Sequence, residues 1–380
     1  MTAPTGERRP RRGRWLVETV GPPLLGFAAA RLASCVGAWL SGVDPLRVSS
    51  WVRWDSFWYL RIATGGYRLE PCAGGTSMFC GSTGWFPGYP ALIAAVMRLG
   101  PGAEAAGFLV AALAHLALLV LVWNRLLERL PGWRSWALLL LAAFFPGTIY
   151  AQAVFPISTV LLLILVFLLA VRGGRPVLAA AAGVGAAFTY PTGCLLAPVY
   201  GVWLLGSAQA SRGDWRRLLP MVGPALGLGA VLALMAAQTG VWDAFFRNQV
   251  QGFGYGLSDP LGTLMSRLVP LFAWRSAGGA LVAAACQTVL VLFIVGWAGA
   301  EAIRSRSEPV TALFGLTLAT YWLFPLLVGG QLSLYRSEAL LLPAVWLLRR
   351  APAVVLGVIL VAAVVLAIPM ARGFFQGALV

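Results

Sequence analysis

Long apolar runs alternate with short polar segments along most of the chain. Eleven such runs, of about 14 to 27 residues each, fall at 16–42, 103–124, 135–150, 155–171, 177–190, 192–208, 218–240, 278–300, 309–328, 335–348 and 352–371. A helix needs about 20 apolar residues to cross the hydrocarbon core of a bilayer, whereas barrel strands are shorter and alternate in polarity. The pattern therefore predicts an all-α integral membrane protein of about eleven transmembrane helices.

Composition supports a membrane-facing surface. The chain is 59% hydrophobic and 11% charged, with a mean hydropathy of +0.82. A soluble domain carries about 25% charged residues, so this chain lacks the polar residues to cover a water-facing surface. The net charge of +15 comes with 28 basic residues, all of them Arg. They gather in short clusters between the apolar runs, as the positive-inside rule predicts, so we expect no nucleic-acid partner.

The arginine clusters also predict an orientation. A basic, Pro- and Gly-containing segment, 1–14, is predicted to be a disordered cytoplasmic tail, and the first run to be a retained signal anchor. The run 86–99 is short and contains Pro87 and Pro90. If it lies on the outer face without crossing, 17 Arg are cytoplasmic and ten are outside; if it crosses, most later clusters face outward. The non-crossing arrangement satisfies the positive-inside rule, and it places both long polar loops, 43–85 and 241–277, outside the cytoplasm.

We expect a single polytopic domain over 15–380 in the plasma membrane. Cys72 and Cys80 flank a short segment of the first outer loop, a spacing that suits either a disulfide or two free thiols. No Cys or His cluster suggests a metal, and the lone His115 sits inside an apolar run as a packed helix residue. The remaining cysteines are expected to be small packing residues.

The first outer loop contains the sequence WVRWDSFWYLRIATGGYRLE, from Trp51 to Glu70. Its first half reads as a helix on the outer surface, rich in the Trp and Tyr that favour the interface, and Gly65 and Gly66 are expected to end it. Asp55 lies among aromatic residues. Two roles stay open for this carboxylate: a general base at a membrane-embedded active site, or one half of an ion pair that fixes the loop. Glu70 is a possible second carboxylate.

Several segments of the chain resemble, in order, the GPI mannosyltransferase II (PIG-V) family. They cover residues 15 to 348, and the first motif is the most specific. The segments are R-W-D at 53–55, Y-L-R-I-A-T-G-G-Y at 59–67, W-F-P-G-Y-P at 85–90, F-F-P-G-T-I-Y at 144–150, F-T-Y-P-T-G at 188–193, F-R-N-Q-V-Q-G-F-G-Y at 246–255, and the stretch from Gln331 to Pro343. The chain departs from the family pattern at Ser56, Phe57 and Trp58, after Tyr150, and at Tyr190.

The resemblance implies a GT-C glycosyltransferase with an extracytoplasmic active site. Such an enzyme moves a hexose, here expected to be mannose, from a polyprenyl-phosphate carrier to a lipid or glycan acceptor. The catalytic role of the first outer loop falls on Asp55. The lipid-linked sugar is a co-substrate, no cofactor is expected, and metal independence is predicted because Arg can stabilise a leaving phosphate. Membrane lipids surround the protein, and the oligomeric state stays open.

The candidate site residues follow from these patterns. Arg336 is the first choice for binding the phosphate, with Arg247, Arg267 and Arg275 as alternatives. The full set of candidates comprises catalytic Asp55 and Glu70, and substrate-binding Arg53, Trp54, Tyr59, Tyr67, Phe86, Tyr255, Gln331 and Arg336. For each aromatic residue of the set, anchoring at the membrane interface is the competing role.

Two other functions stay open from the sequence. A transporter or flippase of lipid-linked sugars would place charges deep in the membrane, where only Arg31 and His115 are found. A non-catalytic membrane scaffold would be indifferent to the loss of the Asp55 carboxylate, whereas an enzyme would lose turnover.

Overall fold

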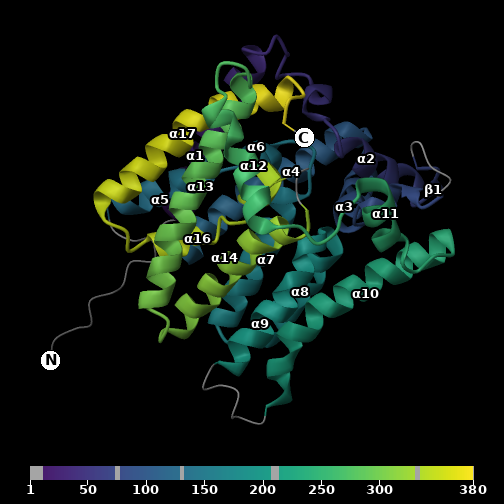
Figure 1. Cartoon of the computed structure of the whole chain (residues 1–380). Coiled ribbons are helices and arrows are strands. Elements are labelled where there is room, and N and C mark those ends of the chain that lie inside the picture. Colours follow the sequence, from purple (N-terminus) through teal and green to yellow (C-terminus); the bar gives the residue numbers. More distant parts are fainter. Residues whose placement is uncertain (1–11, 73–77, 129–131, 207–213, 330–333, 380) are drawn as a thin grey trace.

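A computed structural model describes residues 12–72, 78–128, 132–206, 214–329 and 334–379, with side chains from residue 17 onward. The described chain is a bundle of α-helices (Figure 1). Its β-structure is one antiparallel hairpin of β1 (Leu69–Glu70) and β2 (Cys80–Gly81). The predicted all-α membrane class is confirmed at this level, since apolar helices make up nearly all of the described structure.

Six helices are long and apolar enough to cross a membrane. They are α1 (Arg12–Trp39), α4 (Ala103–Leu121), α10 (Leu219–Thr239), α13 (Gly279–Arg304), α14 (Pro309–Leu327) and α17 (Ala353–Phe375). Helix α1 begins at Arg12, so the last residues of the predicted tail 1–14 are helical. The rest of that tail lies outside the described residues.

The other apolar runs form shorter helices, so the described residues contain six helices of spanning length instead of the predicted eleven. The short apolar helices are α3 (Gly88–Met97), α5 (Trp133–Ala143), α7 (Ile157–Arg172), α8 (Pro176–Thr189) and α9 (Leu196–Leu205). At 1.5 Å per residue, α3 is about 15 Å long, half the thickness of a hydrocarbon core. That length agrees with a segment that does not cross.

Small elements complete the chain and connect these helices. They are η1 (Val48–Trp51), α2 (Ser56–Gly65), η2 (Ser82–Gly84), the π-turn η3 (Val122–Leu126), α6 (Thr148–Gln152), η4 (Pro191–Leu195), η5 (Trp215–Leu218), α11 (Ala244–Phe253), α12 (Pro260–Phe272), α15 (Leu334–Ala339) and α16 (Ala344–Leu348).

The run 335–348 was predicted to be one transmembrane helix, and this was wrong. It forms α15 and α16, joined by tight turns in which Leu340 N donates to Ser337 O and Leu341 N to Glu338 O. Such i→i+3 bonds advance the chain by about 2.0 Å per residue instead of 1.5 Å, so a short segment reaches further. The segment is buried within the bundle, where irregular backbone is shielded from lipid.

Polar contacts bring the cytoplasmically assigned arginine segments together at one end of the bundle. Arg134 Nη1 donates to the carbonyl oxygens of Arg349 (3.2 Å) and Ala351 (3.0 Å). Arg350 bonds both Glu301 (3.1 Å) and Glu308 (2.8 Å). We name this the arginine-rich end.

The residues of the two predicted outer loops meet at the opposite end. Tyr67 N donates to Gln238 Oε1 at 2.8 Å, and Ser258 N donates to Leu327 O at 2.8 Å. Helix α11 contacts strand β2 of the β-hairpin there (Figure 1). The described residues of the two predicted outer loops therefore lie together in space.

Helix α10 approaches α8 through glycines spaced four apart. A Cβ atom on Gly223 would lie 2.3 Å from the carbonyl oxygen of Ala180, and one on Gly227 would lie 2.5 Å from that of Val184. Within a membrane, helices associate through close packing of small residues rather than through the hydrophobic effect. These two glycines therefore set the distance between the two helices.

We predict opposite effects of Gly→Ala substitutions at two positions of α10. Gly223→Ala should destabilise the protein by about 2 kcal/mol, because the added methyl group overlaps backbone that cannot move alone. Gly229→Ala should stabilise it by about 0.5–1 kcal/mol, because nothing lies within 4 Å of its Cβ position and Ala favours the helix. Thermal unfolding in detergent measures both, and equal shifts of the same sign would contradict the packing described here.

Candidate functional site

Asp55 and Arg336 form an ion pair at the outer-loop end of the bundle, although 281 positions separate them in the sequence. Arg336 Nη1 donates to Asp55 Oδ2, and the two side chains are 12% and 21% exposed, Arg336 being the more buried. A pair this shielded from water is held together more strongly than a surface ion pair. Two candidates from distant parts of the sequence are therefore direct partners.

Asp55 reaches Arg336 because the chain turns sharply just before it. The first half of the loop was predicted to be helical from Trp51, but the helix α2 begins only at Ser56. Trp54 has a left-handed backbone conformation (φ 44°), which interrupts a helix. Asp55 occupies the N-cap of α2 but makes no side-chain capping bond. An Asp at this position usually caps its own helix, so its carboxylate is committed to Arg336 instead.

Arg336 lies on α15, which the neighbouring helices fix in place. Gln287 of α13 donates to Glu338 (2.5 Å), and its Oε1 accepts from Gly147 N (3.3 Å). A Cβ atom on Gly147 would lie 2.5 Å from the carbonyl oxygen of Tyr335. Only Gly permits this approach and its left-handed conformation (φ 78°). The turn before α6 thus packs directly against the backbone that carries Arg336.

Aromatic rings surround the ion pair. The guanidinium of Arg336 lies 5.4 Å from the centre of the Phe155 ring. Trp54 packs against Phe374 of α17 at 4.8 Å and faces Tyr150 at 6.5 Å. Cation–π contact and low local polarity both favour a tightly held guanidinium. The site is therefore an ion pair surrounded mainly by aromatic side chains.

A second arginine, Arg31, packs against Trp51 at the start of the same loop segment. Arg31 of α1 lies 4.6 Å from the ring centre of Trp51 and 4.7 Å from that of Phe108, and it donates to the Gln152 carbonyl oxygen at 3.0 Å. Among the described residues, no acid forms an ion pair with it. Aromatic faces thus stabilise this deep charge. The aromatic rings and the Gln152 carbonyl oxygen therefore account for a largely buried guanidinium on α1.

Glu70 pairs with a different arginine. Its carboxylate bonds Arg61 of α2, and it lies in the β-hairpin whose strands Cys72 and Cys80 join by a disulfide. Of the two possibilities that the sequence left open for these cysteines, the structure has the disulfide. None of the described interactions of Glu70 joins it to Asp55 or Arg336. Glu70 therefore ties the hairpin to α2.

The remaining sequence candidates divide between the ion pair and the protein interior. Tyr59 is buried on α2, where its backbone N–H donates to the Asp55 carbonyl oxygen at 3.2 Å. Tyr67 is buried and donates its hydroxyl to Trp85 O (2.8 Å), while Phe86 is buried against Phe245 (4.9 Å). In this structure, the latter two rings are covered, which leaves no open face for a sugar.

Three further candidates lie elsewhere. Arg53 donates its backbone N–H to Ser56 Oγ (3.1 Å), which stabilises the turn before α2. Tyr255 follows α11 and lies 6.0 Å from the Phe253 ring. Gln331 lies outside the described residues.

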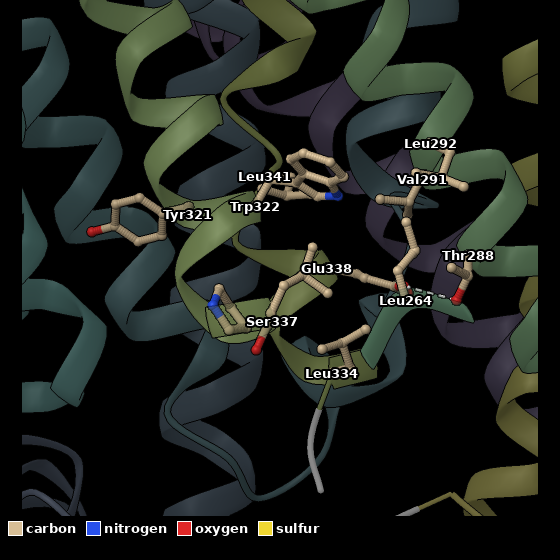
Figure 2. Close-up of a pocket in the computed structure, with 12 residues that line it drawn as sticks. Leu264, Thr288, Val291, Leu292, Tyr321, Trp322, Leu334, Ser337, Glu338 and Leu341 are labelled. Atoms are coloured by element: carbon tan, nitrogen blue, oxygen red, sulfur yellow. Dashed lines mark hydrogen bonds between the residues drawn. The ribbon is translucent and has the colours of Figure 1, made fainter. Parts of the chain in front are cut away.

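Sequence reasoning did not select the buried carboxylate of Glu338 as a site residue. Glu338 is 4% exposed, and it accepts from Thr288 Oγ1 (3.2 Å) as well as from Gln287. It lines a cavity of about 20 Å³, with Tyr321 and Trp322 on the neighbouring α14 (Figure 2). That volume holds about one water molecule. Glu338 and Gln287 could have been identified from the sequence, because each is a polar residue inside an apolar run and such residues are rare in membrane segments.

Comparison with known proteins assigns no family to this chain. A scan against protein-family models gives no match, and neither does a search of curated protein sequences.

We predict strong coupling between the two members of the ion pair. Arg336→Met should cost about 3 kcal/mol of stability, because it leaves the Asp55 carboxylate without its partner. The double substitution Asp55→Leu with Arg336→Met should cost less than Arg336→Met alone, since no charge then stays buried. Thermal unfolding in detergent of wild type, Asp55→Leu, Arg336→Met and the double variant forms a double-mutant cycle. Additive losses would show that the two side chains do not interact.

Proposed function

We propose that this protein is a membrane glycosyltransferase that uses a polyprenyl-phosphate hexose, with mannose as the expected sugar, and an extracytoplasmic lipid or glycan acceptor. The observation that carries the proposal is the Asp55–Arg336 pair, which joins a carboxylate and a guanidinium in an apolar wall. A carboxylate can take a proton from an acceptor hydroxyl, and a guanidinium can stabilise a leaving phosphate.

The arrangement of the motif segments supports this proposal. Three of the segments that resemble the GPI mannosyltransferase II family are far apart in the sequence but meet at the pair. Asp55 comes from 53–55 and Arg336 from the last segment, while Gly147 of 144–150 lies close to the backbone beside Arg336. Residues scattered along a chain gather in this way around a shared site.

A neighbouring helix suits a substrate that arrives from the bilayer. Helix α12 exposes apolar side chains on one face, and its Arg267 bonds the hydroxyl of Tyr335 at 3.0 Å. The exposed residues recur at helical spacing and are Leu261, Met265, Val269 and Phe272. A helix of this kind lies at a membrane interface, where a lipid-linked donor would present its phosphate. Tyr335 precedes Arg336, so α12 borders the candidate site.

The proposed reaction balances with these groups. The acceptor oxygen attacks the anomeric carbon, its proton passes to Asp55, and the bond from that carbon to the phosphate oxygen breaks. The leaving polyprenyl phosphate takes the bonding electrons, and Arg336 offsets its charge. A guanidinium has five N–H donors, so it can hold a carboxylate and a phosphate oxygen at once. A cytoplasmic N-terminus in the plasma membrane, with both long polar loops on the other side, would place this chemistry outside the cytoplasm.

Transfer of radiolabelled mannose from synthetic polyprenyl-phosphate mannose tests the proposal in membranes that express the protein. Asp55→Asn should lower transfer by about a hundredfold or more, because Asn keeps the shape but cannot take the proton. Asp44→Asn is the matched control, since this exposed acid pairs only locally with Arg47 (3.2 Å), and it should leave transfer unchanged.

Two other outcomes would test the role of Asp55 and the transferase function separately. Equal transfer by wild type and Asp55→Asn at matched expression would keep the enzyme but reject Asp55 as its base. Absence of transfer from the mannose, glucose and arabinose carriers would reject the transferase function and favour a transporter or scaffold.

A further inference from the structure

A large groove opens at the arginine-rich end, far from the Asp55–Arg336 pair along the bundle. Its volume is about 880 Å³, and it runs along one face of α4 between α1 and α7. The walls are apolar, and the mouth is polar. The lining comprises Leu113, Leu116, Ala117, Val120, Leu121, Leu162 and Val166 in the walls, with Thr19, Asn124, Arg125 and Glu128 at the mouth.

Irregular backbone shapes the mouth of this groove. Helix α4 ends in the π-turn η3, a rare conformation that is often found at functional sites. Asn124 within the turn donates to Thr19 O of α1 at 3.0 Å. Glu128 has a left-handed backbone (φ 49°), which is strained for a residue other than Gly. Two uncommon conformations within seven residues thus present Asn124, Arg125 and Glu128 together.

Among the described residues of the mouth, one guanidinium, that of Arg125, pairs with no acid. Glu128 forms an ion pair with Arg172 of α7, so these two charges offset each other. Arg125 is exposed, and among the described residues its guanidinium forms no hydrogen bond or ion pair. The guanidinium of Arg125 is therefore the charge that a ligand would meet.

Tryptophans indicate the depth of the mouth in the bilayer. Trp123 donates to Glu18 O at 3.1 Å and packs against Trp136 at 5.5 Å. Trp133 and Trp136 are 52% and 41% exposed. Exposed Trp gathers where hydrocarbon meets headgroups. The apolar groove below this level therefore lies among acyl chains, and Arg125 lies among headgroups.

We propose that the groove binds one anionic phospholipid, with an acyl chain along α4 and the phosphate on Arg125. Basic sites between transmembrane helices are suited to anionic headgroups. A zwitterionic lipid offers the same chains but brings its own cation to Arg125. A helix of a second copy would leave this guanidinium without a partner, so charge favours the anionic lipid.

Native mass spectrometry of the full chain tests this proposal with phosphatidylglycerol and phosphatidylcholine as probes. Wild type should retain one phosphatidylglycerol in preference to phosphatidylcholine. Arg125→Gln should lower that retention by about fivefold, the effect of one basic residue at a lipid surface. Ala117→Phe should lower retention of both lipids, because the exposed position faces the groove and the larger side chain fills it.

Matched variants at other surfaces serve as controls. Arg306→Gln removes another exposed arginine of the same end, and Val202→Phe enlarges an exposed apolar residue of α9; both should bind as wild type does. Equal retention by Arg125→Gln and Arg306→Gln would overturn the assignment of the headgroup to Arg125. Equal retention of the two lipids by wild type, or a dimer that Ala117→Phe dissociates, would overturn the anionic phospholipid as occupant.

Discussion

The ion pair between Asp55 and Arg336 constrains the two segments of the chain that depart most from regular helices. One segment leaves α1, turns at Trp54 with a left-handed backbone and starts α2. The other segment forms α15 and α16 inside the bundle instead of a single helix. Breaking a buried ion pair costs about 3–5 kcal/mol, so the pair favours one arrangement of both segments over any in which they move apart.

The surrounding contacts support the two partners separately. Arg31 and its aromatic neighbours hold Trp51, from which the chain leads to Asp55. Gln287 links Glu338 to the turn at Gly147, which fixes α15 and therefore Arg336. These polar contacts lie inside the bundle, where unmet hydrogen bonds are costly and satisfied ones specify position. These contacts therefore hold Asp55 and Arg336 in defined positions with little exposed surface.

Hydrophobic pattern and arginine position predicted the class of protein and the grouping of segments at two ends. Both depend on whether each side chain favours water or lipid, and that preference follows from the residue type alone. Helix lengths were less predictable, because the buried run 335–348 is shielded from lipid by the protein and need not be helical. The Asp55–Arg336 contact could be suggested by residue type, whereas the role of Glu338 depends on partners from α13 that sequence spacing does not reveal. The groove at the other end depends on the π-turn, which has no recognisable sequence signal here.

The proposed function assigns different tasks to the two members of the pair, and binding can be measured apart from turnover. The most direct test is equilibrium binding of polyprenyl-phosphate mannose to purified wild type, Asp55→Asn and Arg336→Gln, each first shown to be folded. The account predicts that Asp55→Asn binds the donor about as wild type does, because its carboxylate acts on the acceptor, while Arg336→Gln loses about tenfold or more in affinity with its phosphate contact. Wild-type binding that Arg336→Gln leaves unchanged would contradict the account.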